Sequence, residues 1–203
     1  EKPDQEAVPS RQFDISKIDF DLLSREFAHT RRKNLLLRDL DELVNQQLAK
    51  MLFANPQRID YYDRYQEIID AYNAEQNRAT IEKTFMDLME LASSLDTEQQ
   101  RYVREGFSSD EELSVYDLLF SENLTKQEIE TIKKVSVDLL TKIKQQIAKL
   151  DHWTDKQETK AIVDNLIRKT LWQELPNSYD VSDIQTYQKK IYEYVYMRYP
   201  EVA

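Results

Sequence analysis

Residues 35–56 read LLLRDLDELVNQQLAKMLFANP, a run in which apolar residues recur at every third or fourth position. This spacing places the apolar side chains along one face of an α-helix. Asn55-Pro56 closes the run, because a proline disfavours helical backbone at the residue before it. The stretch therefore predicts a long amphipathic helix. Its apolar face consists of Leu35, Leu36, Leu40, Leu43, Val44, Leu48, Met51 and Leu52.

The same periodicity continues on both sides of this helix. Upstream, Ser16 and Asp19 have the spacing of a capping box and predict a helix over about 17–30. Downstream, Pro56 suits the first turn of a new helix. A break is expected around residues 73–77, where the pattern falters. The inward face before the break is predicted to be Ile59, Tyr62, Tyr65, Ile69 and Tyr72, and after it Ile81, Phe85, Leu88, Leu91 and Leu95.

Gly106, the only glycine in the chain, is predicted to end a helix in the left-handed conformation, which other residues adopt at a cost. Later helix starts are marked by hydroxyl residues that can cap the first turn. The predicted caps are Ser109 with Glu112, Thr125 with Glu128, Thr154 with Gln157, and Ser182. They open periodic segments that include 126–150, 155–174 and 183–199.

Together these signals predict an all-α fold, an irregular bundle of seven or eight helices with no sheet. Residues 1–15 contain Pro3 and Pro9 and few apolar side chains, which is typical of a linker or tail. Residues 16–203 form the helical domain, with a possible subdivision near 106–124. The opening Glu1-Lys2-Pro3-Asp4 has no initiator methionine, so the chain is expected to be a piece of a longer protein.

The composition excludes several kinds of site. A single glycine is too few for the phosphate-binding loop of P-loop ATPases or for the dinucleotide fingerprint. Without cysteine, disulfides and cysteine zinc sites are excluded, and His29 and His152 are too distant in sequence for a local metal motif. No apolar run approaches the roughly 20 residues of a membrane span. We therefore expect a cytoplasmic protein with no membrane contact and no catalytic, metal or cofactor-binding residue in these 203 residues.

The net charge of -10 is confined to the middle of the chain. Residues 57–122 carry 6 Lys and Arg against 16 Asp and Glu, whereas both flanking thirds are nearly neutral. Such a stretch repels phosphates, so DNA contact by it is improbable. An acidic solvated face is the simplest interpretation, and docking to a basic partner surface is the alternative.

Acidic pairs such as Asp60 with Asp63 are expected by chance among 38 acids. Glu158-Thr159-Lys160 superficially matches the end of a nuclease motif, but the surrounding pattern is helical rather than the strand setting which that motif needs. Neither feature predicts catalysis.

Two kinds of surface contact are predicted. Tyrosine is enriched at interfaces, and the tyrosines of the last helix occupy more than one face. The basic stretch at 31–33 and one line of the 126–150 helix are candidates for phosphate contact. For the stretch at 31–33, a solvated turn or a pairing surface for an acidic partner is the favoured interpretation. The candidate partner contacts are Arg58, Tyr61, Arg64, Tyr192, Tyr196 and Tyr199. The candidate phosphate contacts are Arg31, Arg32, Lys33, Lys126, Lys133 and Lys144.

The stretch Asn55-Pro56-Gln57-Arg58-Ile59-Asp60-Tyr61-Tyr62, continuing to Tyr72-Asn73, resembles the C-terminal helical domain of the restriction (R) subunit of type I restriction-modification enzymes. The resemblance covers roughly residues 14–199. It is supported by Ile18-Asp19-Phe20, Glu105-Gly106-Phe107-Ser108, Glu111-Glu112-Leu113, Tyr116-Asp117-Leu118-Leu119 and Trp153-Thr154.

The resemblance implies that this chain is a non-catalytic assembly domain. In the family, the parent subunit is an ATP-dependent deoxyribonuclease, whose magnesium-dependent nuclease domain and ATP-hydrolysing motor domains lie elsewhere. The helical domain is implied to bind the motor domains and to dock the subunit onto the methyltransferase and specificity subunits, reaching DNA through the whole complex. An alternative function is a DNA-contacting module that guides duplex to or from the motor.

Overall fold

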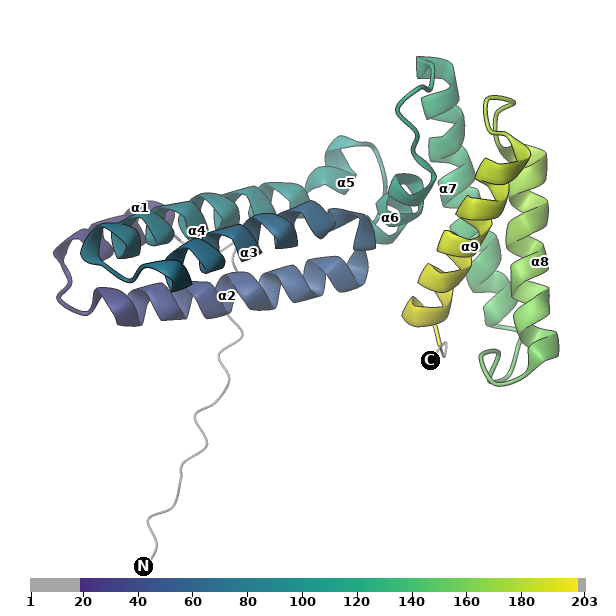
Figure 1. Cartoon of the computed structure of the whole chain (residues 1–203). Coiled ribbons are helices and arrows are strands. Elements are labelled where there is room, and N and C mark those ends of the chain that lie inside the picture. Colours follow the sequence, from purple (N-terminus) through teal and green to yellow (C-terminus); the bar gives the residue numbers. More distant parts are fainter. Residues whose placement is uncertain (1–18, 201–203) are drawn as a thin grey trace, which may run out of the picture. The chain divides into compact units, whose positions relative to one another are not determined.

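The computed structural model describes residues 19–200, and this part of the chain contains nine α-helices, one 3-10 helix and no strand (Figure 1). The all-α prediction is confirmed. The helices form two compact units. Unit 1 takes the described residues up to Ala49 together with Tyr61–Glu98, and unit 2 takes Lys50–Asp60 together with the described residues from Gln99 onward. The division falls at other positions than the expected 106–124.

Unit 1 is built from α1 (Phe20–His29), most of α2 (Lys33–Ala54), most of α3 (Ile59–Ala74) and α4 (Arg78–Gln99). The rings of Phe27 in α1 and Phe85 in α4 stack at a centroid distance of 3.6 Å. The predicted periodic faces supply most of the core. Its buried members include Leu37, Leu40, Val44, Leu48, Tyr65, Ile68, Phe85, Leu88, Leu91, Ala92 and Leu95.

Helix α1 begins later than predicted. Its first residue is Phe20, and the Asp19 side chain accepts a hydrogen bond from the Leu22 amide at 2.9 Å. Asp19 is therefore the cap itself rather than the third residue of a capping box. Ser16, the predicted cap, lies outside the described residues.

The predicted end of α2 and the predicted break after α3 are confirmed. Helix α2 ends at Ala54, the Asn55 side chain caps the 3-10 helix η2 (Pro56–Arg58), and α3 follows directly. The break between α3 and α4 falls at residues 75–77. The inward face of α3 is only partly as predicted, because Ile59 and Tyr62 are exposed and Ile68 is buried instead.

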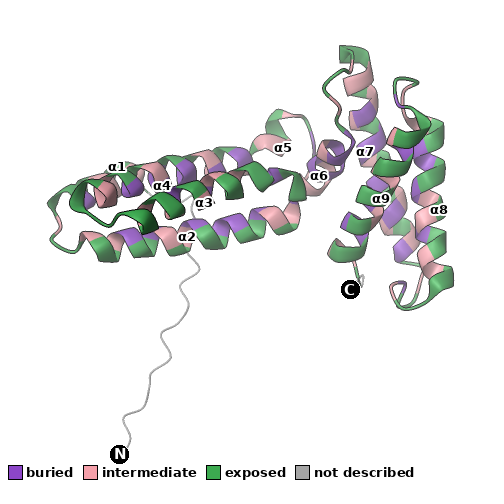
Figure 2. Ribbon diagram, in the orientation of Figure 1, coloured by how far each residue is buried: buried purple, intermediate pink, exposed green. Residues whose placement is uncertain are grey.

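Unit 2 contains α5 (Arg101–Arg104), α6 (Asp110–Leu119), α7 (Lys126–Ile147), α8 (Gln157–Glu174) and α9 (Val181–Arg198). Helix α7 packs against α6 and α8, and α9 packs against α6 and α8. Their inward faces form a continuous core, visible as the purple stripes of Figure 2. Fully buried members of this core include Leu113, Leu119, Ile132, Leu139, Ile143, Trp153, Val163, Ile167, Leu171, Ile191 and Val195.

The helix caps of unit 2 were predicted with mixed success. Thr125 and Glu128 form the complete capping box that starts α7. Ser109 caps α6 as expected, although the Glu112 carboxylate accepts from the Ser108 amide rather than from that of Ser109.

The other two predicted caps are wrong. Helix α8 starts after Lys156 with no side-chain cap, so Thr154 does not cap it. Helix α9 is capped by Asp180, with Asp183 completing the box, and Ser182 lies inside the helix.

Gly106 adopts the predicted left-handed conformation, with φ of 84°. The Gly106 amide donates to the Val103 carbonyl at 3.1 Å, and the Phe107 amide donates to the Tyr102 carbonyl at 2.9 Å. This pair of bonds is the Schellman motif that ends many helices. It terminates α5 and turns the chain toward α6.

Candidate functional site

Two of the segments that carry the family resemblance, the one that begins at Asn55 and the one that contains Asp117, meet at a junction within unit 2. The Asn55 amide donates to Asp117 Oδ2 at 2.6 Å, and the Arg101 guanidinium donates to both Asp117 oxygens, at 3.1 and 2.5 Å. The Ser114 hydroxyl donates to the Ala54 carbonyl at 3.0 Å. The end of α2 is therefore fastened to α6 by polar contacts between residues about sixty positions apart.

Arg58 completes this junction. Its guanidinium makes two hydrogen bonds to the Asp110 carboxylate, at 3.0 and 2.6 Å. The residue is only 4% exposed, which corrects the prediction that Arg58 faces a partner. A two-pronged pair of this kind fixes the relative orientation of its groups as well as joining them.

The electrostatics of the junction are those of a structural contact. Burial raises the pKa of Asp117, and the hydrogen bonds and positive charge of Arg101 act in the opposite direction. A carboxylate held by an arginine and an amide is satisfied within the protein. The junction therefore joins the end of α2 to α6 by satisfied polar contacts within unit 2.

The other two contacts predicted near this segment lie on α3. Tyr61 is half-buried. Arg64 keeps 42% of its side chain exposed and pairs with Glu90 of α4 at 2.9 Å. Arg64 thus remains accessible, but its charge is already matched within unit 1.

An aromatic cluster surrounds Trp153, in the turn before α8. Trp153 is 1% exposed, and its indole N–H donates to the Tyr199 carbonyl at 2.6 Å. The rings of Tyr192 and Tyr196 meet the indole edge-on at centroid distances of 6.2 and 5.7 Å. Trp153 therefore anchors the turn before α8. Tyr196 remains 39% exposed.

Tyr199 lies deeper than the prediction of a partner contact implies. It is half-buried, and its ring meets that of Tyr194 edge-on at 6.3 Å. Burial raises the pKa of both phenols. Beside them, Glu111 forms an ion pair with Lys144 that lowers the pKa of the carboxyl although burial alone would raise it. These tyrosines mainly serve the packing of α9.

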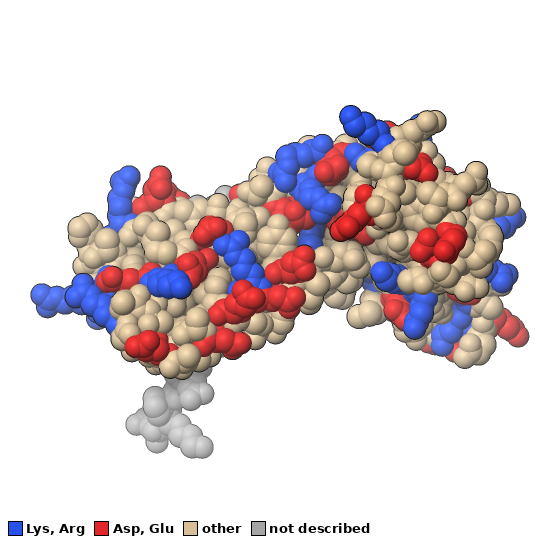
Figure 3. All heavy atoms as spheres, turned by 45° about the horizontal axis from the view of Figure 1, so that its top comes forward, with Lys and Arg blue, Asp and Glu red and all other residues tan. Residues whose placement is uncertain are grey.

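Three of the candidate phosphate contacts are paired with carboxylates of the same unit. Lys133 bonds the Glu105 carboxylate at 3.1 Å, Lys144 pairs with Glu111, and Lys33 pairs with Glu82 at 2.8 Å. Lys126 is exposed at the start of α7. The predicted line of α7 lysines is therefore largely neutralised. On the face shown in Figure 3, acidic side chains gather along unit 1, whereas both signs are interspersed over unit 2.

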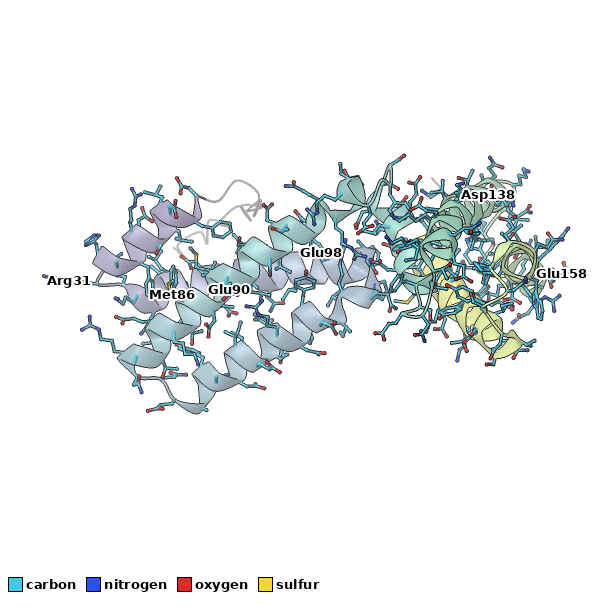
Figure 4. All side chains as sticks on the ribbon, turned by 90° about the horizontal axis from the view of Figure 1, so that it is seen from above. Arg31, Met86, Glu90, Glu98, Asp138 and Glu158 are labelled. Atoms are coloured by element: carbon cyan, nitrogen blue, oxygen red, sulfur yellow. The ribbon has the colours of Figure 1, made fainter. Side chains whose placement is uncertain are left out.

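Arg31 and Arg32 differ from these lysines. Both are exposed in the turn between α1 and α2, and Figure 4 shows Arg31 pointing outward at the end of unit 1. Exposure leaves a solvated turn, phosphate contact and pairing with an acidic partner as predictions for this turn.

Exposed apolar side chains on α8 and α9 were not predicted. Trp172 is 49% exposed and Met197 is 70% exposed. Ile162 and Trp172 are ten residues apart, so their side chains point in directions about 80° apart, both on the side of α8 away from the buried Ile167. This spacing is not that of a single helix line, so the sequence gives no clear signal for them.

Within residues 19–200, no three His, Cys, Asp or Glu side chains come together in a group that could hold a metal ion. None of the helices in this range is long and apolar enough to cross a membrane.

Comparison with known proteins identifies the family. No curated protein and no solved structure matched the chain. Residues 6–199 match the family described as "Type I restriction enzyme HindI endonuclease subunit-like, C-terminal". This match includes every helix described above. The chain therefore belongs to the family of C-terminal regions of type I restriction endonuclease subunits.

Proposed function

We propose that this chain is an assembly domain, which docks the DNA-translocating endonuclease subunit onto the methyltransferase and specificity subunits. The observation that carries the proposal is the set of exposed apolar side chains on α8 and α9. Ile162, Trp172, Tyr196 and Met197 are all between 39% and 70% exposed, although unit 2 already has a closed core. Large apolar side chains that stay exposed although the core is complete favour contact with another protein.

The aromatic cluster around Trp153 supports the same function. Tyr196 is braced by the buried indole, so its orientation is fixed before any partner arrives. Rigid aromatic side chains lose little conformational entropy on binding and are frequent energetic anchors of interfaces. Tyr196 with Met197 is therefore our choice of anchor.

The charges of α7 favour protein docking over DNA guidance. Affinity for duplex DNA depends on Lys and Arg that are available to replace counterions at phosphates. Lys133 and Lys144 are held by Glu105 and Glu111, so binding phosphate through them would first break these pairs.

A second candidate function, guidance of DNA, is supported by Arg31 and Arg32 alone. Both are exposed. Among the ion pairs of the described residues, none involves either guanidinium. This turn could contact a phosphate backbone that passes the end of unit 1.

Size-exclusion chromatography tests both functions. The endonuclease subunit would be mixed with its methyltransferase-specificity complex, with and without DNA, at low and moderate salt. Docking predicts co-elution without DNA that persists at moderate salt. Co-elution that requires DNA and disappears as salt rises would support the guide function instead.

Two variants sharpen this experiment. The double substitution Tyr196→Ala, Met197→Ala should weaken docking by roughly tenfold or more, because truncated interface anchors cost more than about 1.4 kcal/mol. The matched control, Arg31→Gln with Arg32→Gln, should leave docking unchanged. Loss of complex formation in the control alone would contradict the proposal.

A further inference from the structure

Arg198, the last residue of α9, lies over an aromatic ring at the end of α2. The central carbon of its guanidinium, Cζ, is 4.7 Å from the ring centroid of Phe53. Both residues belong to unit 2, and neither is part of its core cluster. The contact is a cation–π interaction, in which the face of the ring attracts the positive charge. The docking function proposed above does not use this pair.

The Arg198 guanidinium has donors without acceptors. Among residues 19–200 it makes no ion pair and no hydrogen bond, although every one of its N–H groups is a donor. Glu111 of α6 interacts electrostatically with Arg198, but its carboxylate is already paired with Lys144. Arg198 is therefore a cation that the Phe53 ring holds in place and that the described carboxylates do not neutralise.

The side chains around this cation are exposed and mainly apolar. Phe53 is 56% exposed, and Met197, the residue before Arg198, is 70% exposed. Lys50 is exposed one turn before Phe53 on α2, and residues at this spacing are neighbours on the helix surface. A guanidinium is planar and weakly hydrated, so a partner can cover it at a lower cost than an ammonium group.

These features suit a carboxylate that another protein supplies. The fork of N–H groups on a guanidinium matches the two oxygens of a carboxylate, and the hydrogen bonds between these charged groups are strong. A phosphate fits the same fork, but affinity for DNA depends on several available Lys and Arg. Lys144 is held by Glu111, and duplex DNA would leave the apolar side chains beside Arg198 uncovered. The exposed Phe53 and Met197 therefore favour a protein as the source of the anion.

We propose that Arg198 and Phe53 form a carboxylate-binding site, which receives an Asp or Glu side chain of the methyltransferase-specificity complex. Phe53 orients the guanidinium, and together with Met197 it packs against an apolar side chain next to the bound carboxylate. The inference rests on the docking function and extends its contact surface from the end of α9 to the end of α2. Arg198 selects an acidic segment, because a basic one would bring like charges together.

Substitutions at Arg198 test the site in the whole endonuclease subunit. Arg198→Gln should weaken binding to the methyltransferase-specificity complex by roughly tenfold or more, because the partner's carboxylate loses its counter-charge within the interface. Arg198→Lys should restore only part of this loss, because an ammonium group cannot make two parallel hydrogen bonds. The matched control, Lys134→Gln, removes one positive charge from an exposed position of α7 and should leave binding unchanged. An equal loss in the control would contradict a specific site.

A double-mutant cycle tests whether Phe53 acts through Arg198. Phe53→Ala should weaken binding by itself. Combined with Arg198→Gln, it should cause a clearly smaller loss than the product of the two single losses, because the ring has no guanidinium left to hold. Independent losses would contradict the paired site.

Circular dichroism and the melting temperature would show that the variants fold. If Arg198→Gln does not fold, Phe53→Ala still decides the question, because Phe53 is largely exposed. Unchanged binding by a folded variant of either residue would overturn the carboxylate site and leave docking through Tyr196 and Met197 intact. Failure of the unsubstituted subunit to bind would overturn both.

A photo-crosslinker at position 53 tests the chemistry of the occupant. The crosslinked peptide should come from the methyltransferase or specificity subunit and contain Asp or Glu next to an apolar residue. Replacing that acid by its amide should weaken binding as much as Arg198→Gln does, with little further loss when the two changes are combined. A crosslink to DNA, or to a peptide without an acid, would contradict the inference.

Discussion

At the scale of single residues, Arg58 shows that a charged residue type does not reliably predict an exposed position. Its guanidinium is almost fully buried, and the two hydrogen bonds to Asp110 compensate for the lost water. Asp110 lies 52 positions away in the sequence, so no local pattern predicts this pairing. The side chain contributes to stability rather than to recognition.

Replacing Arg58 should destabilise unit 2 strongly. Arg58→Ala leaves Asp110 unpaired and opens a cavity, with an expected loss of about 3 kcal/mol in the free energy of unfolding. Arg58→Lys should recover less than half of this loss, because an ammonium group cannot make the two parallel bonds. Urea unfolding checks both values. A loss below about 0.5 kcal/mol, the range of ordinary surface substitutions, would contradict the structural role.

Asp117 predicts a pH dependence. Its pKa is raised by burial and held down by Arg101, so Arg101→Ala should raise that pKa further above the unfolded value. A carboxyl whose folded pKa is raised contributes stability below its unfolded pKa, and this contribution is lost as pH rises through the folded pKa. The destabilisation of Arg101→Ala should therefore be largest at pH 7 and shrink toward about pH 4, near the unfolded pKa of aspartate.

The control for this measurement is the double substitution Arg101→Ala, Asp117→Asn, which removes the titrating group. Its destabilisation relative to the unsubstituted protein should vary much less over the same range of pH. Equal pH dependence in the single and double variants would show that another group is responsible.

At the scale of elements, the helices were predictable and their first residues were not. Apolar spacing, Pro56 and Gly106 are local signals, and they located α2, α3 and the end of α5. The cap predicted for α8 was wrong because that helix starts at Gln157 with no side-chain cap, and the cap predicted for α9 was wrong because Asp180 takes that position. Asp180 makes a reciprocal pair with Asp183, which Ser182 cannot match from inside the helix.

The candidate site was less predictable than the fold. Its tyrosines were identified from their abundance, but whether each faces the core or solvent depends on tertiary neighbours. Tyr196 and Tyr199 are three residues apart at the same helix end, and only Tyr196 is exposed. The Tyr199 ring instead meets Tyr194, and its phenol lies near Glu111 of α6. A pocket in unit 1 between α2, α3 and α4 has no sequence signature, because three separate helices contribute its lining.

Gly106 provides a test at this scale. A Cβ added at Gly106 would have no neighbour within 4 Å, so the cost of substitution is set by the backbone conformation alone. Gly106→Ala should lose about 1 kcal/mol of unfolding free energy. Gly106→Asn should lose less, because asparagine tolerates the left-handed region better. If asparagine proves as costly as alanine, the expected preference for the left-handed region is not what sets the cost.

At the scale of the whole molecule, each unit has its own core. Both tryptophans, Trp153 and Trp172, lie in unit 2, so tryptophan fluorescence reports on that unit, whereas circular dichroism reports on the helices of both. The two signals can therefore separate the stabilities of the units.

Leu91→Ala and Leu139→Ala form a matched pair for this experiment. Both side chains are fully buried, Leu91 in unit 1 and Leu139 in unit 2, and each truncation should cost about 2–5 kcal/mol. Leu91→Ala should lower the urea midpoint seen by circular dichroism and leave the fluorescence midpoint nearly unchanged. Leu139→Ala should lower the fluorescence midpoint. Equal shifts of both signals in both variants would mean that the units unfold as one.

The junction at Asn55 and Arg58 also constrains the order of events during translation. These residues leave the ribosome before their partners Asp117 and Asp110, which follow 62 and 52 positions later in the chain. At roughly 5–20 residues per second, the wait is several seconds. During this time unit 1 can complete its helices. The 50–60 segment of unit 2 stays exposed to water until Asp110 and Asp117 have been synthesised. The nascent chain therefore finishes unit 1 first, and unit 2 closes around a segment made before it.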